Sequence, residues 1–190
     1  MKLFAPKFVL PILAAAVLSA PAFAQQKLVP AQSEIVFVSK QMGVPVEGRF
    51  KKFDAQITFD PAKPETSKMA FTIEVASASF GAPETDAELP KAAWFSTAKF
   101  PQATFQSTTV KGTGPGKLEV TGKLSIKGNV RDVVVPVVLT QAGPTTTANG
   151  SFVLKRLAFK IGEGEWTDTS MVADDVQVKF KLALTGVGKI

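Results

Sequence analysis

The stretch LSIKGNVRDVVVPV, residues 124–137, contains two apolar runs that meet at Gly128-Asn129. Glycine and asparagine both accept positive φ, so this pair predicts a two-residue turn that joins two antiparallel strands in a hairpin. Lys127, Arg131 and Asp132 surround the predicted turn. Exposed turns are commonly charged, so we interpret these three residues as a solvated hairpin tip rather than as a catalytic cluster.

Pro136 lies within the second strand of this hairpin. Because proline has no N–H to donate to a neighbouring strand, it predicts a sheet edge or a bulge at this position. A barrel that contains this strand would be incompletely closed near Pro136, which would provide an entrance for a ligand.

Alternation of apolar and polar residues with a period of two continues on both sides of the hairpin and dominates the chain. It predicts eight strands, at residues 33–39, 46–59, 69–75, 102–110, 117–126, 130–139, 152–161 and 176–184. Turn-forming residues predict loops between them at 60–67, 111–117 and 141–150. Eight sequential strands with short connections predict an all-β fold, either an eight-stranded antiparallel barrel or a sandwich.

One long segment, residues 79–101, interrupts the strand pattern. Within it, Thr85-Asp86-Ala87-Glu88 has the form of a capping box, which predicts that a short helix begins there. Pro90 would end this helix after about one turn, so we expect one short helical segment near residues 85–95.

Alternation does not show which face of each strand points inward, so an outer-membrane barrel with apolar side chains toward lipid is an alternative. Such barrels carry aromatic girdles at both interfaces, whereas this sequence has no tyrosine and two tryptophans, Trp94 and Trp166. Several predicted strands are also shorter than the ~9–11 residues that cross a bilayer. The pattern therefore favours a barrel with its apolar faces inward.

The first 24 residues have the features of a secretory signal peptide. Lys2 and Lys7 precede an apolar run that is too short to span a bilayer, and Ala22-Phe23-Ala24 has the small-x-small form of a cleavage site. We therefore expect cleavage after Ala24, a single domain over residues 25–190, and a periplasmic location.

The residue types that are absent limit the chemistry of this chain. The sequence has no histidine and no cysteine, which excludes Ser-His and Cys-His nucleophile pairs and the usual zinc and copper sites. The formal net charge is +6, but the basic residues are scattered and do not form the clustered stripe typical of nucleic-acid binding. We expect no metal, no cofactor, no nucleic-acid partner and no catalytic activity.

Acidic residues are concentrated in residues 162–175, at positions Glu163, Glu165, Asp168, Asp174 and Asp175. A calcium loop or a pair of glycosidase carboxylates is one interpretation, but the spacing is not that of an EF-hand. Carboxylates in a loop are usually solvated, and we interpret them in this way. A hydrolase that uses Glu163, Glu165 and Asp132 is a separate hypothesis.

Several motifs extend over nearly the whole chain after residue 24: Ser33-x-Ile35-x-Phe37, Val46-x-Gly48-x-Phe50-x-x-Phe53, Phe59-Asp60-Pro61, Asp86-x-x-Leu89, Trp94-Phe95, Lys99-Phe100-Pro101-x-Ala103-x-Phe105, Val120-x-Gly122-x-Leu124-x-Ile126-x-Gly128 and Arg156-x-x-Phe159. In this order and spacing they resemble the YceI-like proteins, a family of secreted bacterial proteins. The resemblance implies an extended lipocalin-like barrel and binding of polyisoprenoids or other lipids. The family often has a histidine near Gln41 and another at Glu88, so this chain departs from it at both positions.

An eight-stranded barrel is near the size at which its interior is either filled by side chains or hollow enough for one small ligand. The extended barrel that the resemblance implies favours a hollow interior. We therefore expect a periplasmic carrier for a long apolar ligand such as a polyisoprenoid, an isoprenoid quinone or a fatty-acid derivative. Apolar residues of the strands would bind it: Phe37, Phe53, Ile57, Phe59, Phe71, Ile73, Phe105, Leu124, Ile126, Phe152, Phe159, Val178, Phe180 and Leu182.

A filled barrel is the main alternative. The protein would then act through its surface as a non-catalytic stress or redox partner of a membrane redox protein. A homodimer is a separate hypothesis about partners. The two hypotheses differ in whether the space between the strands is open.

Overall fold

The computed structural model describes residues 26–190, so the predicted signal peptide over residues 1–24 lies outside the described residues. The described chain is built mainly of strands and has one short α-helix, α1 (Pro83–Glu88), as expected for the all-β class. The strands are β1 (Lys27–Leu28), β2 (Glu34–Gln41), β3 (Val44–Phe50), β4 (Phe53–Thr58), β5 (Lys68–Glu74), β6 (Ala78–Ser79), β7 (Gln102–Gly114), β8 (Lys117–Ile126), β9 (Asn129–Ala142), β10 (Thr145–Lys155) and β11 (Asp175–Thr185).

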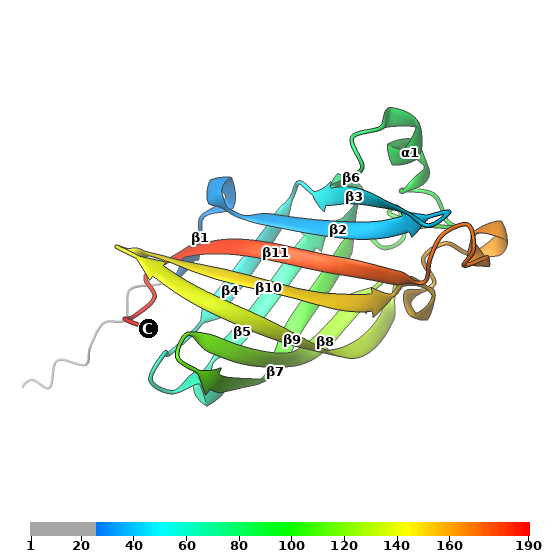
Figure 1. Ribbon diagram of the computed structural model, residues 1–190. Helices are drawn as coiled ribbons and strands as arrows, with labels where there is room; N and C mark the ends of the chain where they lie inside the picture. The colour runs from blue at the N-terminus through cyan, green and yellow to red at the C-terminus, as the bar shows by residue number, and fades with distance from the viewer. Residues whose placement is uncertain (1–25) are drawn as a thin grey trace, which may run out of the picture.

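All eleven strands belong to one antiparallel sheet that curls around an interior (Figure 1). The strand order is β4-β5-β7-β8-β9-β10-β11-β2-β3-β6, and β1 pairs with β11. β3 and β4 lie near opposite ends of this order but are separated in the chain only by Lys51 and Lys52. The Lys51 N–H donates to Ser77 O (3.2 Å) and the Glu74 N–H donates to Lys52 O (3.0 Å), so these lysines bridge the curled sheet into a lipocalin-like barrel.

The predicted count of eight strands differs from the eleven observed for two reasons. β1 and β6 have two residues each, which is too short to produce an alternating pattern. The predicted strand 46–59 is observed as β3 and β4, because the backbone bends at Lys51-Lys52. This bend allows Phe50 and Phe53 both to pack against the interior, although an odd separation would place them on opposite faces of an unbroken strand.

The turn of the β8–β9 hairpin is Lys127-Gly128, so the predicted turn at Gly128-Asn129 is wrong by one residue. Lys127 has φ 48° and Gly128 has φ 75°, the pair of positive angles that a type I′ turn requires. Asn129 instead begins β9 opposite Ile126, and its side-chain amide donates to the Lys127 carbonyl at 2.9 Å. This hydrogen bond stabilises the turn around a lysine in the left-handed region.

The predicted loop 141–150 is also wrong, because residues 145–150 belong to β10 and pair with β9. Only Gly143-Pro144 remain as a turn. Thr146 and Ala148 occupy buried positions in this part of β10. Threonine and alanine are small and weakly apolar, so they conceal the alternation that larger side chains would have shown.

Two further boundaries differ from the predictions. The predicted strand 152–161 ends at Lys155, and a 3-10 helix over Arg156–Phe159 follows it. β7 extends to Gly114 and reduces the predicted loop 111–117 to a tight turn. In the first case the alternating sequence continues beyond the strand, but the buried residues of the 3-10 helix, Arg156 and Phe159, are three apart, as its three residues per turn require.

The helical segment near residues 85–95 is observed as α1, but α1 begins at Pro83, before the predicted capping box at Thr85. Proline suits the first turn of a helix because its φ is fixed and its missing N–H would be unpaired there. Ala82 is the N-cap residue and makes no side-chain cap hydrogen bond, so the predicted capping box is wrong. No helix within residues 26–190 is long and apolar enough to cross a membrane.

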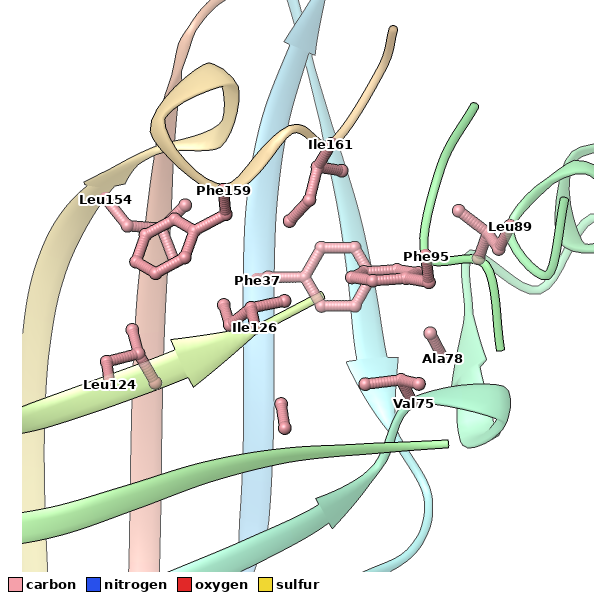
Figure 2. Packing of buried hydrophobic residues seen from close by; sticks show 11 residues of the cluster. Phe37, Val75, Ala78, Leu89, Phe95, Leu124, Ile126, Leu154, Phe159 and Ile161 are labelled. Carbon is pink, nitrogen blue, oxygen red and sulfur yellow. The ribbon is translucent and has the colours of Figure 1, made fainter. Parts of the chain in front are cut away.

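Apolar side chains of the strands point toward the enclosed space, and charged side chains point outward. In β11, Leu182 is buried whereas its neighbour Lys181 is exposed. Figure 2 shows one buried cluster, to which side chains from several strands contribute, including Phe37 of β2 and Leu124 of β8, together with Phe95. This orientation is the reverse of the outer-membrane alternative, in which apolar side chains face outward.

Pro136 marks the point at which β9 separates from β10, in agreement with the predicted sheet edge. The β9–β10 ladder ends at the pair Val137 and Gly150. Residues 129–136 of β9 therefore pair with β8 but not with β10. A proline is tolerated at this position because no β10 carbonyl requires its N–H.

Candidate ligand-binding cavity

Two adjoining cavities occupy the interior of the curled sheet. The larger has a volume of about 600 Å³ and the smaller about 120 Å³. Both are lined by the same five apolar side chains at their junction: Ile35, Ile73, Leu124, Phe152 and Val178. The larger cavity extends toward α1 and the segment around Trp166, and the smaller extends toward Leu184, so together they follow the long axis of the barrel.

Most of the predicted binding residues line one or both cavities. Phe37 and Ile126 line the larger cavity only. Six others line the smaller cavity only: Ile57, Phe59, Phe71, Phe105, Phe180 and Leu182. Ile73, Leu124, Phe152 and Val178 lie at the junction and line both.

Phe53 and Phe159 are the two predicted residues that line neither cavity. Phe53 packs at the edge of the buried cluster formed around Val110 and Leu118. Phe159 is almost fully buried, and it belongs to the 3-10 helix that follows β10 rather than to a strand. Both side chains therefore pack against the residues that line the cavities and do not face the open space.

Three phenylalanine rings lie against glycines of neighbouring strands, and this arrangement leaves the interior open. A methyl group at Gly48 would come within 2.4 Å of the Phe37 ring. The same distance separates an added methyl group at Gly150 from the Phe180 ring, and Gly122 is covered in the same way by Phe105. Because these glycines have no side chain, the rings can lie along the wall instead of projecting across the cavity.

The wall becomes polar at the α1 end of the larger cavity. Ser39 and Gln41 continue the inward-facing row that Ile35 and Phe37 begin on β2. Ser39 is only 7% exposed, and neither side chain makes a hydrogen bond to any residue that the structure describes. These two positions could have been found from the sequence, because the alternating row of β2 changes from apolar to polar at Ser39.

Helix α1 and the two tryptophans complete this end of the cavity. Glu84, Thr85 and Glu88 project from α1 and line it. Trp94 comes from the loop after α1 and Trp166 from the 3-10 helix Gly164–Thr167, and their ring centroids are 5.5 Å apart. None of these positions was predicted as a binding residue, because only the tertiary structure brings the loops over the end of the barrel.

Arg156 lines the same cavity and is 1% exposed. Its guanidinium donates to five backbone carbonyls: Nε to Ala173 (3.1 Å), Nη1 to Ile161 (2.9 Å) and Gly162 (3.2 Å), and Nη2 to Trp166 (2.6 Å) and Val172 (2.6 Å). Burial lowers the pKa of Arg156 from its usual range. The side chain thus holds the segment 161–173 against the end of β10.

Lys127 corrects the interpretation of the hairpin as a solvated tip. Its side chain is buried, and Nζ donates to Ala92 O (2.7 Å), Lys160 O (2.7 Å) and Glu163 Oε2 (2.8 Å). The hydrogen bond and the positive charge of Lys127 lower the pKa of Glu163. Arg131 and Asp132 are exposed, as predicted.

In the described chain, four of the five acidic residues of the 162–175 segment, all except Glu165, have structural partners. Besides Glu163, Asp174 accepts a hydrogen bond from Leu157 N–H at 2.9 Å, and Asp175 pairs with Lys155 at 2.5 Å. Asp168 accepts from the N–H and hydroxyl of Ser170. Within residues 26–190, no group of three acidic residues is arranged to hold a metal ion.

Comparison with known proteins agrees with this architecture. A model of the YceI-like domain matches residues 26–184. The crystal structure of BcnA from Burkholderia cenocepacia superposes with a TM-score of 0.80 at 47% sequence identity, covering 83% of this chain and 99% of that one. A polyisoprenoid binding domain from Saccharophagus degradans has the same fold, with a TM-score of 0.69 at 17% identity over 85% of this chain and 98% of that domain.

Protein YceI of Escherichia coli O157:H7 is 40% identical to this chain over 96 residues, which are 50% of this chain and 50% of that protein. A UPF0312 protein of Azotobacter vinelandii is 41% identical over 88 residues, which are 46% of this chain and 46% of that protein. The chain thus spans about half the length of this relative. Because the domain model covers nearly all of residues 26–190, the chain belongs to the YceI-like domain family.

Proposed function

We propose that this chain is a non-catalytic binding protein that carries a long apolar ligand, such as a polyisoprenoid, an isoprenoid quinone or a fatty-acid derivative. The pair of adjoining cavities is the observation that carries the proposal. Their combined volume is within the ~300–1,000 Å³ range of ligand pockets. The walls are apolar except at one end, which suits a chain with a single polar terminus.

The driving force for binding would be burial of the chain. Each methylene group removed from water contributes about 0.8 kcal/mol. A few isoprene units would therefore outweigh the ~4–15 kcal/mol that association requires. The ligand contacts would be the twelve predicted residues that line the cavities, with Phe53 and Phe159 acting as support.

The fold of the Saccharophagus degradans domain adds to this support, since that protein is described as a polyisoprenoid binding domain. The filled-barrel alternative requires side chains to occupy the interior, and a cavity of about 600 Å³ does not favour it.

The proposed carrier acts in the periplasm after residues 1–24 have been removed as a signal peptide. Gln26 follows the proposed cleavage site closely and is already part of the domain. Its side-chain amide donates to Phe59 O at 2.6 Å and accepts from Phe59 N–H at 2.7 Å, as a neighbouring strand would. Secretion of the full-length chain and N-terminal sequencing of the product test this assignment, with Gln25 expected as the first residue.

Native mass spectrometry of the protein, purified from the periplasm without detergent, tests the proposed function. We expect a bound apolar molecule that organic extraction removes and that a polyprenol can replace. Intrinsic fluorescence provides a second readout, because both tryptophans of the sequence line the larger cavity. Absence of a co-purified lipid, together with no fluorescence change on addition of any polyprenol, would contradict the proposal.

A further inference from the structure

Three exposed apolar side chains form a patch at the α1 end of the barrel, here called the methionine patch: Met42, Val44 and Met171. Met42 lies in the turn of the β2–β3 hairpin, and Val44 is the first residue of β3. Met171 belongs to the segment that precedes β11, and the Met42 N–H donates to its carbonyl at 2.8 Å. Figure 1 shows the β2–β3 turn and this segment at the same end of the barrel as α1.

The fold does not require an exposed methionine at position 42. The Met42 side chain is 78% exposed, and the turn has φ 48° at Met42 and φ 81° at Gly43. Such a type I′ turn favours asparagine, aspartate or glycine, because the left-handed region is unfavourable for residues with larger side chains. Met42 therefore makes the turn less favourable and buries little of its own surface, which indicates a role for its side chain outside the folded chain.

The other exposed large apolar residues within residues 26–190 have an ordinary explanation. Val130, Val134, Val138 and Val153 belong to β9 and β10, where valine suits the strand conformation, and Ile190 is the last residue. Scattered apolar residues on a protein surface are common. Both methionines of the patch lie outside the strands, so strand propensity does not explain them, and apolar side chains that gather in one place mark interaction sites.

The methionine patch borders the opening of the larger cavity. Its two methionines are the chain neighbours of Gln41 and Val172, which line the cavity and form a β-bridge with each other. Glu84 lines the same cavity and is exposed, so the cavity reaches the surface at this end. The three patch residues themselves lie outside the cavity lining.

A lipid surface suits the methionine patch better than a protein partner does. Three side chains are too few for the ~800 Å² per partner that a standard protein–protein interface buries. Contact with a membrane instead strengthens with whatever apolar area enters the lipid, and flexible, polarizable methionine adapts to that environment. Exposed residues of both signs lie near the patch, including Lys40, Glu84 and Asp168, so apolar contact and not charge would dominate.

We propose that the methionine patch docks the barrel on a lipid surface, so that an apolar chain passes directly between the membrane and the larger cavity. This inference rests on the proposed function. Exposure of each methylene group to water is unfavourable, and a chain that enters the cavity from a docked position avoids that exposure.

Co-sedimentation with phosphatidylcholine vesicles tests the docking. We expect the wild type to bind these vesicles and Met42→Asn/Val44→Ser to reduce the partition coefficient at least about tenfold, since apolar area is lost from the contact. Asparagine is preferred in a type I′ turn, so this variant keeps the hairpin. Val153→Ser is the matched control for Val44→Ser, because Val153 is 57% exposed and Val44 is 62% exposed, and it should not change the partition coefficient.

Uptake of geranylgeraniol from the same vesicles, followed by tryptophan fluorescence, connects docking with the cavity. In solution without vesicles, Met42→Asn/Val44→Ser should bind geranylgeraniol with unchanged affinity, because neither residue lines the cavity. Its uptake from vesicles should be slower in proportion to its loss of vesicle binding. Salt at about 1 M should not release the wild type, since it screens charges and leaves apolar contacts intact.

The outcomes separate the docking surface from the proposed function. Failure of the wild type to bind vesicles, release by salt, or equal effects of Val44→Ser and Val153→Ser would overturn the docking surface while carriage of the chain stands. A dimer in light scattering that Met42→Asn/Val44→Ser makes monomeric would show that a second copy covers the patch, which also overturns lipid docking. If the wild type binds vesicles through the patch but takes up no geranylgeraniol, the proposed function fails and the docking surface stands.

Discussion

Glycines opposite phenylalanine rings show how single residues keep the barrel hollow. The Phe37 ring lies over Gly48, its partner across the β2–β3 ladder, and the Phe180 ring lies over Gly150, its partner across β10–β11. Each ring buries its face against backbone and thereby leaves the central space free. A larger residue at any of these glycines would have to move a ring into the cavity.

Gly48→Ala should therefore reduce the larger cavity. The atoms nearest to the added methyl group all belong to the Phe37 ring, with Cζ at 2.4 Å, so the ring rather than the backbone must move. We expect about 1–3 kcal/mol loss in the free energy of unfolding and weaker polyprenol binding.

Gly112→Ala is the matched control for this change, because its nearest contact is Pro64 Cγ at an unstrained 3.6 Å. Its free energy of unfolding should change by less than about 0.5 kcal/mol, with unaltered binding. Urea denaturation and tryptophan fluorescence titration measure both quantities. Equal binding by the two variants would contradict the role assigned to the ring.

At the scale of elements, the barrel end is held by buried side chains that reach across loops. Arg156 binds segment 161–173 through five carbonyls, and Lys127 ties the β8–β9 turn to that segment and to the loop at Ala92. On α1, Asp86 accepts hydrogen bonds from the Ser79 hydroxyl (2.7 Å) and the Phe80 N–H (2.6 Å). The charged side chains of Arg156, Lys127 and Asp86 therefore position loops instead of facing solvent.

Replacing Arg156 should release its segment. Arg156→Met retains an apolar stem but leaves buried carbonyls without donors, so the free energy of unfolding should fall by at least about 3 kcal/mol. Hydrogen exchange should increase over residues 161–173 before it increases in the strands. Arg49→Met, at an exposed position of β3, is the control and should alter neither. Unchanged exchange in 161–173 of the Arg156 variant would disprove this anchoring role.

The attachment of α1 to Ser79 and Phe80 should weaken at acidic pH, because it depends on the ionised carboxylate of Asp86. The hydrogen bond from the Ser79 hydroxyl is the main cause that lowers the pKa of Asp86 in the folded protein. Because the pKa of Asp86 is lower in the folded than in the unfolded protein, ionised Asp86 stabilises the fold at pH values above its unfolded pKa of about 3.9. This stabilisation is lost as the pH falls through the pKa that Asp86 has in the folded protein.

Asp86→Asn tests this contribution. The variant should be less stable than the wild type at neutral pH, and the two urea midpoints should converge as the pH falls below about 3.9. Asp54→Asn, exposed on β4, provides the comparison for a general loss of one carboxylate. A constant difference in midpoint between the Asp86 variant and the wild type at all pH values would be inconsistent with this mechanism.

At the scale of the whole molecule, the two cavities act as one binding site only if a chain passes their junction. Val178 lines both cavities, beside Leu124 and Phe152. Val178→Phe should narrow the junction and confine the ligand to the larger cavity. Long chains would then lose contacts worth about 0.8 kcal/mol per methylene, whereas short chains would not.

A mixture of polyprenols of increasing length, analysed by native mass spectrometry, measures this effect. We expect the ratio of bound long chains to bound short chains to fall at least about tenfold in Val178→Phe. Val153→Phe makes the same change on the exposed face of β10, where Val153 is 57% exposed, and should leave the ratio unchanged. An unchanged length profile for Val178→Phe would show that bound chains do not cross the junction.

The alternating pattern of the sequence is sufficient to predict the all-β class and most of the cavity wall. Period-two alternation locates the strands because side chains in a strand point to opposite faces, and burial of one face follows from its apolar composition. Twelve of fourteen predicted wall residues face the cavities for this reason. Alternation failed where small residues hide it, as at Thr146 and Ala148, and where the alternating sequence continues although the strand has given way to a 3-10 helix, as at Phe159.

The residues that close one end of the barrel and make its wall polar are brought together by long-range packing. Glu88, Trp94 and Trp166 line one end of the larger cavity, and their meeting depends on loop paths that no local periodicity encodes. Lys127 likewise reaches Glu163 from a distant part of the sequence. The same holds for Arg156, whose five acceptors become available only when the 161–173 segment wraps around it. Local patterns report which way a side chain points, whereas the partner that it meets depends on long-range packing.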